Sequence, residues 1–366
     1  MRCKNRFMGV LAGLVLAVPA LGLPPYEFVP LNQPGIAFSR AFEINNLGVV
    51  ALEAGSGTGA TIGFRWSGGV FEPLPTIVPS GSNALATVRS INDANQVVGN
   101  SYGPGGLFDQ RGVRWNADGT LNDLGRYNNS NTFFQDINEA GVIVGNSNRA
   151  FRYTPGSGYT ELTALNGSPT ASAQAINELG WIVGSSLAEV SPGQNQTRAT
   201  LWKPDGTRVN LGMLEIPGQS NNTSVALGVN DVGTIVGYFG NPLAFSRAFY
   251  WTEATGMVDL GAPGGRSSFA NDVNDSGYIV GYASFAAAPQ QRAYLWYQGV
   301  AYDLNTFLPP GSGWVLTEAF GINELGDIVG RGEFAGQTQA FLLRVIPEPA
   351  SLALLSVAFL RLLRRR

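Results

Sequence analysis

A short stretch that recurs seven times constrains the fold of this chain more than any other feature. Its last copy is Ile322-Asn323-Glu324-Leu325-Gly326-Asp327-Ile328-Val329-Gly330. The asparagines of successive copies lie 39 to 53 residues apart, and they are Asn45, Asn92, Asn138, Asn177, Asn230, Asn274 and Asn323. A repeat of this length predicts one domain made of similar units, each of which buries its apolar face against its neighbours.

The residues around each asparagine are typical of a β-hairpin. In the sixth copy, the segment 270–273 leads into Asn274-Asp275-Ser276-Gly277. A type I turn prefers Asn first and Gly fourth, so residues 278–282 are expected to form the second strand. A third strand is predicted at 292–296 and a fourth at 301–304, and the other copies repeat this pattern.

Seven units of four antiparallel strands predict an all-β fold, a seven-bladed β-propeller, because propellers contain four to eight such blades. An open solenoid of strands is the alternative. The seventh repeat ends after its third strand, at 339–343, whereas residues 26–31 form a strand that precedes the first hairpin and lacks a partner. We therefore expect the N-terminal strand to complete the last blade and close the ring, which protects both edges.

The composition excludes several classes of chemistry. Cys3 is the only cysteine, and the chain contains no histidine. These absences exclude Ser-His and Cys-His nucleophiles, zinc-thiolate sites and a histidine base. Without the two terminal segments described next, the chain has 16 basic and 25 acidic residues, a net charge of −9. Nucleic acid is therefore not an expected partner, since its binders need a basic surface.

The N-terminus is predicted to be a secretory signal peptide, residues 1–22. Arg2, Lys4 and Arg6 precede an apolar run at 7–18, and Ala20-Leu21-Gly22 offers small residues for cleavage. The alternative is a transmembrane anchor. It is disfavoured because the run has 12 residues, whereas a bilayer span needs about 20.

Residues 345–366 resemble the sorting tail of bacterial PEP-CTERM proteins. Pro347-Glu348-Pro349 is followed by an apolar segment and then by Arg364-Arg365-Arg366. The resemblance implies an exosortase-type sorting protease as partner, a transient transmembrane helix that anchors the chain in the inner membrane, and delivery to the surface or extracellular matrix of a Gram-negative bacterium. An apolar helix that closes the domain core is the alternative. Residues 23–344 are then the propeller.

The repeats also resemble the HAF family of extracellular repeats, named for a His-Ala-Phe sequence at the start of the third strand. This chain has Arg149-Ala150-Phe151, Arg247-Ala248-Phe249 and Gln339-Ala340-Phe341 there, so Arg or Gln replaces the histidine. The resemblance covers about residues 26–344 and implies an exported repeat domain, without a reaction.

Three kinds of recurring side chain are interpreted as structural. Each turn asparagine can accept hydrogen bonds from its own turn. The tryptophans are expected to pack between blades, and the arginines of the third strand are expected to bridge neighbouring blades. The tryptophans are Trp66, Trp115, Trp202, Trp251 and Trp296, and the arginines are Arg111, Arg149, Arg198, Arg247 and Arg292.

The connections between strands differ on the two faces of the predicted propeller. Those that join strands one to two and three to four are short and regular, whereas the others are long and variable. The long-loop face is therefore predicted to bind a partner. Its aromatic and polar side chains suit sugar rings and their hydroxyls, and solvated loops are the alternative. The predicted ligand-binding residues are Tyr102, Tyr127, Asn128, Asn222, Arg266 and Trp314.

The function predicted from the sequence is a non-enzymatic, exported, surface-displayed or matrix-associated protein that binds a glycan such as an exopolysaccharide, or a surface protein. The first alternative is a glycan hydrolase or lyase with acidic residues near the axis, Glu43, Asp136 and Asp272, which lie two residues before a turn asparagine. A structural adhesin without a saturable ligand is the second. No cofactor and no metal site are predicted. Calcium at the Asp-rich turns remains an alternative, although none has the spacing of a calcium loop.

Overall fold

The computed structural model describes residues 23–32, 36–55, 61–78, 85–220, 222–241, 244–285 and 291–347. The predicted signal peptide, 1–22, lies outside the described residues. So does the predicted sorting tail from Glu348 onward, and of its motif only Pro347 is described, as an exposed residue. Within the described ranges, no helix has the length and apolar character to cross a membrane.

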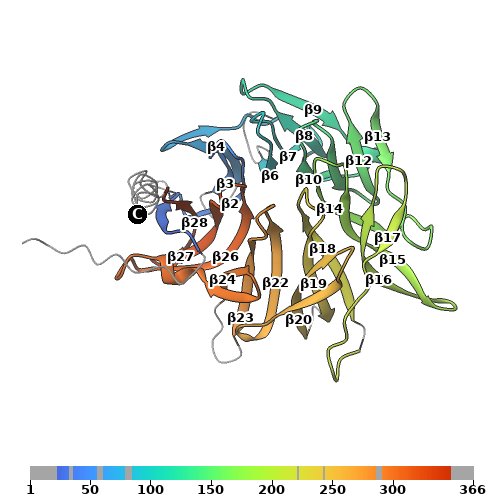
Figure 1. Cartoon of the computed structure of the whole chain (residues 1–366). Coiled ribbons are helices and arrows are strands. Elements are labelled where there is room, and N and C mark those ends of the chain that lie inside the picture. The colour runs from blue at the N-terminus through green and yellow to red at the C-terminus, as the bar shows by residue number, and fades with distance from the viewer. Residues whose placement is uncertain are drawn as a thin grey trace, which may run out of the picture. The chain divides into compact units, whose positions relative to one another are not determined.

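Seven antiparallel sheets of four strands each form a seven-bladed β-propeller (Figure 1). Blade 1 contains β2 (Phe38–Ile44), β3 (Val50–Gly55), β4 (Thr61–Ser67) and β5 (Val70–Pro73). Blade 2 contains β6 (Ala86–Ile91), β7 (Val97–Tyr102), β8 (Gln110–Trp115) and β9 (Leu121–Gly125). Blade 3 contains β10 (Phe133–Ile137), β11 (Ile143–Asn146), β12 (Ala150–Thr154) and β13 (Gly158–Glu161).

The next three blades have the same order of strands. Blade 4 contains β14 (Ala171–Ile176), β15 (Ile182–Ser191), β16 (Gln194–Trp202) and β17 (Arg208–Asn210). Blade 5 contains β18 (Thr223–Val229), β19 (Ile235–Asn241), β20 (Phe245–Thr252) and β21 (Gly256–Gly261). Blade 6 contains β22 (Gly265–Val273), β23 (Ile279–Phe285), β24 (Gln291–Tyr297) and β25 (Val300–Asp303).

The two ends of the chain share blade 7, whose strand order is β26 (Trp314–Ile322), β27 (Ile328–Phe334), β28 (Gln337–Val345) and β1 (Tyr26–Pro30). Just beyond β1, the backbone N–H of Leu31 donates to the Ala340 carbonyl at 3.0 Å. The prediction that the N-terminal strand closes the ring is confirmed. The first strands of successive blades contact one another in a complete cycle, from β2 through β26 and back to β2.

The first strand of every blade carries a β-bulge at the residue three positions before its turn asparagine. Ladder pairing therefore skips one residue per blade, and these bulge residues are Phe42, Arg89, Gln135, Gln174, Leu227, Asn271 and Phe320. A bulge places an extra residue on one strand and turns its side chain out of the regular alternation. The bulge residue of every blade consequently lines the space around the propeller axis, and in blades 1 to 6 its successor lines it as well.

The bulge region also explains the recurring Ile-Val-Gly sequence of the second strand. A Cβ atom on this glycine would lie 1.9 to 2.2 Å from a carbonyl oxygen of the first strand in blades 2 to 7. Such a contact is far shorter than any van der Waals distance, so in these six blades the approach of the two backbones requires glycine. The glycines are Gly99, Gly145, Gly184, Gly237, Gly281 and Gly330, and blade 1 has Leu52 at the aligned position.

Apolar clusters lie between adjacent blades, and the recurring tryptophans belong to them. Trp66 of blade 1 packs in one cluster with Val329 of blade 7, and Trp251 of blade 5 packs with Leu201 of blade 4. The predicted packing role of the tryptophans is confirmed.

The prediction for the recurring arginines is wrong for four of the five. Arg111, Arg149, Arg247 and Arg292 form ion pairs with Asp123, Glu161, Asp259 and Asp303, each on the fourth strand of the arginine's own blade. The reason is register, since the third and fourth strands pair directly and bring these side chains together. Arg198 does reach the next blade, where it donates to the Asn222 carbonyl at 3.3 Å.

The seven turn asparagines form a closed ring of hydrogen bonds, hereafter the asparagine ring. Each Oδ1 accepts from the backbone N–H four residues later in its own turn. Each Nδ2 donates to the backbone carbonyl of the asparagine in the next blade, at 2.8 to 3.2 Å, and the last bond runs from Asn323 back to Asn45. The asparagines therefore join the blades as well as hold the hairpins.

We predict that Asn177→Asp destabilises the propeller by about 2 to 4 kcal/mol at pH 7. Aspartate retains the oxygen that accepts from Trp181 but loses the Nδ2 donor to Asn230, and it places a buried charge beside that carbonyl. Because burial favours the protonated acid, which can donate, the loss should shrink at pH 4. Urea unfolding at both pH values measures the effect.

Asn210→Asp is the matched control. Asn210 is exposed and accepts from Gly212, and the corresponding residue in blades 2 and 5 is already an aspartate that makes the same bond, Asp123 or Asp259. Equal stability of the Asn177 variant and this control would show that the bond between blades is unimportant.

Candidate functional site

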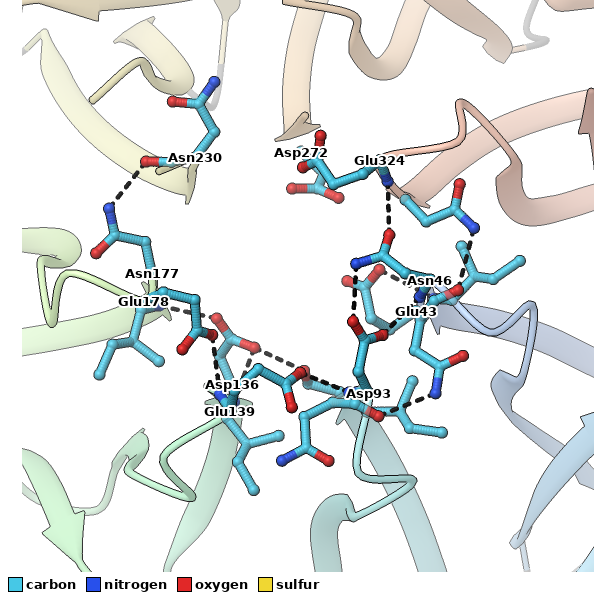
Figure 2. Close-up of a pocket in the computed structure, with 18 of the residues that line it drawn as sticks. Glu43, Asn46, Asp93, Asp136, Glu139, Asn177, Glu178, Asn230, Asp272 and Glu324 are labelled. Atoms are coloured by element: carbon cyan, nitrogen blue, oxygen red, sulfur yellow. Dashed lines mark hydrogen bonds between the residues drawn. The ribbon is translucent and has the colours of Figure 1, made fainter. Parts of the chain in front are cut away.

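A second ring of hydrogen bonds, hereafter the acidic ring, surrounds the axis on the tight-turn face. The ring is formed by the residues that follow the turn asparagines. The side-chain oxygen of each one accepts a hydrogen bond from the backbone N–H of the equivalent residue in the preceding blade, at 2.5 to 3.2 Å. Figure 2 shows part of this ring, where Glu324 bonds to Asn46 and Asn46 to Asp93. Its members are Asn46, Asp93, Glu139, Glu178, Asp231, Asp275 and Glu324.

Glu43, Asp136 and Asp272, hereafter the axial carboxyls, lie deeper along the axis. All three line a cavity of about 260 Å³ that opens on the acidic ring (Figure 2). They also line a second cavity, of about 210 Å³, on the other side. Each first strand runs toward its tight turn, so this second cavity lies toward the long-loop face. We call the two the mouth cavity and the inner cavity.

Two axial carboxyls are held by backbone groups of neighbouring blades. Asp136 Oδ2 accepts from the Ile176 N–H at 2.8 Å, and Asp272 Oδ2 accepts from the Ile322 N–H at 2.9 Å. Their Oδ1 atoms accept from the next N–H in their own strands, at 2.8 Å each. Glu43 accepts one bond, from Ile44 to Oε1 at 3.0 Å, and among the described residues its Oε2 has no hydrogen-bond partner.

The electrostatics around the axis favour protonation of these acids. Burial and then the Asp272 carboxylate raise the pKa of Glu43 well above its usual value. Burial raises the pKa of Asp272 to about 6, against the backbone hydrogen bonds, which lower it. Burial also raises the pKa of Asp136. Carboxyls with raised pKa values in a cavity are features of functional sites, although a structural network can produce them as well.

All seven bulge residues line the inner cavity, so its wall is mixed in character. Phe42 and Phe320 contribute aromatic rings whose centres are 5.3 Å apart, and the guanidinium of Arg89 lies 4.7 Å from the centre of the Phe42 ring. The remaining members are Gln135, Gln174, Asn271 and Leu227. Aromatic faces beside amides and a cation are groups that can stack on and hydrogen-bond to a small polar ring.

The six ligand-binding residues predicted from the sequence lie away from the axis, and apart from the adjacent Tyr127 and Asn128 the structure places them on different blades or loops. The ring of Tyr127 packs at a tilt against those of Phe151 and Tyr159, and Trp314 is buried against Phe28 and Phe334. Tyr102 is half-buried at the end of β7, and Asn222 is buried before β18. Asn128 and Arg266 are exposed. None of the six lines the mouth cavity or the inner cavity.

Two sets of residues around the axis were not predicted from the sequence. A signal for the acidic ring was present, because the residue after the turn asparagine is Asp or Glu in six of seven copies. The bulge residues share no side-chain type, so their common position follows only from the strand pairing. In the described ranges, no group of three or more acidic side chains has the arrangement of a metal site.

Comparisons with known proteins show no family. No protein-family model and no curated protein match the chain. AofleA from Arthrobotrys oligospora is 12% identical over 78% of this chain and 91% of its own, with a TM-score of 0.38. The SapL1 lectin in complex with alpha methyl fucoside is 14% identical over 76% and 99%, with a TM-score of 0.41.

A puromycin hydrolase is 14% identical, with a TM-score of 0.46. The match covers 86% of this chain and 53% of the hydrolase. These values are too low to relate the function of this chain to that of any of the three proteins.

We predict that Glu43→Gln stabilises the propeller at pH 8 and leaves its stability unchanged at pH 4. A carboxyl whose pKa is raised on folding contributes most to stability below its ordinary pKa of about 4.3, and this contribution is lost as pH rises through the folded value. Glutamine resembles the protonated form and still accepts from Ile44, so the variant avoids this loss. Urea unfolding at the two pH values measures the difference.

Glu189→Gln is the control, since Glu189 is exposed outside both axial cavities and accepts from the Gly193 N–H, a bond that glutamine can keep. If Glu43→Gln does not raise the free energy of unfolding at pH 8, the ionised Glu43 carboxylate does not destabilise the propeller.

Proposed function

We propose that the chain is a non-enzymatic carbohydrate-binding propeller whose binding site is the inner cavity. The observation that carries the proposal is the meeting of Phe42 and Phe320 with amide side chains at the axis. Sugar rings present an apolar face that stacks on aromatic rings, and their hydroxyls need donors and acceptors. Gln135 supplies both kinds of group. The side-chain nitrogens of Gln174 and Asn271 donate to Ser172 Oγ at 2.9 Å and to the Ala319 carbonyl at 2.8 Å, so these two residues contribute mainly acceptor oxygens. The cavity of about 210 Å³ suits one ring rather than an extended segment.

The arrangement of the axial carboxyls supports binding over hydrolysis. A glycosidase needs two carboxyl groups that reach the scissile bond, one as acid and one as base or nucleophile. Both oxygens of Asp136 and of Asp272 are already engaged by backbone N–H groups of the first strands. Glu43 alone keeps an oxygen without a hydrogen bond in the described part of the chain. Asp136 and Asp272 are thus suited to joining neighbouring blades, and Glu43 has an oxygen open to a hydrogen bond from a ligand hydroxyl.

The proposal includes export and display at the cell surface or in the extracellular matrix. Its support is the pattern of the two ends, a signal-peptide-like segment at 1–22 and a PEP-CTERM-like tail with Pro347-Glu348-Pro349 and a final arginine cluster. Fractionation of the native bacterium should find the protein outside the cytoplasm, and removal of residues 347–366 should abolish its retention at the envelope. Cytoplasmic protein in both cases would refute this part.

We predict saturable binding of at least one neutral or acidic oligosaccharide by the full chain, measured by titration calorimetry against a panel. Phe320→Ala should weaken that binding about 3- to 10-fold, because it removes an aromatic face. Phe108→Ala is the matched control, since Phe108 is 85% exposed in η1 (Gly106–Phe108), outside both axial cavities. Unfolding midpoints show whether both variants fold.

Three other outcomes would count against the proposal. Binding that survives Phe320→Ala but is lost in Tyr102→Ala or Trp314→Ala would move the site to the outer loops. Release of reducing ends that depends on Asp136 would make the protein an enzyme. A complete lack of saturable binding would leave a structural adhesin as the better account.

A further inference from the structure

Arg89 differs from the other two arginines near the inner cavity. Arg40 pairs with Glu53 at 2.5 Å, and Arg331 pairs with Glu318 at 2.8 Å. Arg89 makes no ion pair with any described residue, and its single hydrogen bond goes to the adjacent Val88 carbonyl at 3.2 Å. Among these five side chains, Arg89 is therefore the charged group without an ion-pair partner.

The position of Arg89 is fixed by the fold. It is the bulge residue of β6, so its side chain is turned toward the axis, where it lines the inner cavity. Its guanidinium lies against the Phe42 ring, and Arg40 lies 5.2 Å from the centre of the same ring. Burial lowers the pKa of Arg89, and the nearby Arg40 charge adds to this effect against the opposing effect of Glu53. A guanidinium in such a place gains from an anion that enters the cavity.

The cavity restricts where that anion can sit. The axial carboxyls line the same cavity, where they can hydrogen-bond to ligand hydroxyls, and a negative group of the ligand is repelled by any of them that is ionised. The ligand must then carry an anionic group at one side and hydroxyls at the other, on a ring that can stack on Phe320. A guanidinium recognises a carboxylate through two parallel N–H donors, which fixes the orientation of the ring.

We infer that the inner cavity binds an acidic sugar, a uronate residue whose carboxylate is received by Arg89. This inference rests on the proposed carbohydrate-binding function and specifies the class of ligand. Phe320 stacks on the sugar ring, the amides and axial carboxyls hydrogen-bond to its hydroxyls, and Arg89 distinguishes a uronate from a neutral hexose. The acidic ring repels the same ligand at the tight-turn face, so the polyanion approaches from the long-loop face.

The test compares oligomers of galacturonate, glucuronate and mannuronate with their methyl esters, by calorimetry on the full chain. At least one acid oligomer should bind more tightly than its ester. Arg89→Gln should weaken binding of that acid about 10- to 100-fold, because a charge-assisted pair is lost, and should leave the ester unaffected. Arg89→Lys should restore part of the affinity. Arg247→Gln is the control, since its guanidinium is paired with Asp259 outside both axial cavities.

Equal affinity for acid and ester, with Phe320→Ala weakening both, would overturn the inference and leave the carbohydrate-binding proposal in place. Loss of acid binding in Arg266→Gln, with Arg89→Gln unchanged, would overturn it as well. Failure of every acid, ester and neutral oligomer to bind would overturn both proposals. Unchanged binding of a neutral oligomer by Arg89→Gln, or an unchanged unfolding midpoint, shows that the variant is folded.

Discussion

The amide of the turn asparagine is the interaction on which the rest of this propeller depends. At each of the seven positions, the asparagine side chain makes two kinds of hydrogen bond. Its oxygen accepts from a backbone N–H of its own hairpin, and its nitrogen donates to a carbonyl of the next blade. Because the last bond returns from Asn323 to Asn45, the ring has no end within the described part of the chain. The shared blade 7 closes the outer part of the same structure by pairing β1 with β28.

The two ends of the axis differ in the groups that surround them. On the tight-turn face, the acidic side chains accept hydrogen bonds from backbone N–H groups of neighbouring blades, and their carboxylates concentrate negative charge there. Toward the long-loop face, the bulge in each first strand turns a side chain of any type into the axial space. The same backbone geometry in each blade thus places Phe, Arg, Gln, Leu and Asn side chains around one cavity. A regular repeat can in this way line a cavity with chemically different groups.

Most of the fold was predictable from the sequence, whereas the candidate site was not. The seven Asn-x-x-Gly turns (Asn at the fourth position in one copy) with their flanking apolar strands set the number of blades, and the unpaired segment at 26–31 identified the closing strand. The prediction that the arginines bridge blades failed because a pattern within one repeat does not show whether a side chain forms its ion pair within its own blade or with the next one. Arg111 and Asp123, for instance, are neighbours across one strand pair.

The bulge residues were not predictable for a different reason. Phe42, Arg89 and Asn271 share neither chemistry nor an evident motif, and only the skipped pairing shows that they occupy equivalent positions. Loop length, in contrast, is visible in the sequence, so it directed attention to outer residues such as Tyr102 and Arg266. These outer residues remain predictions, and the axial cavity offers the more concentrated set of groups.

The central claim, that hydrogen bonds around the axis close the propeller into one cooperative unit, is tested most directly by native-state hydrogen exchange. The relevant amides are those that donate to the asparagine oxygens, Val49, Gln96, Val142, Trp181, Thr234, Tyr278 and Asp327. The account predicts that all seven exchange only through global unfolding, with one common free energy. Much faster exchange of Val49 and Asp327, which flank the junction of blades 7 and 1, would show that the ring is open and would contradict it.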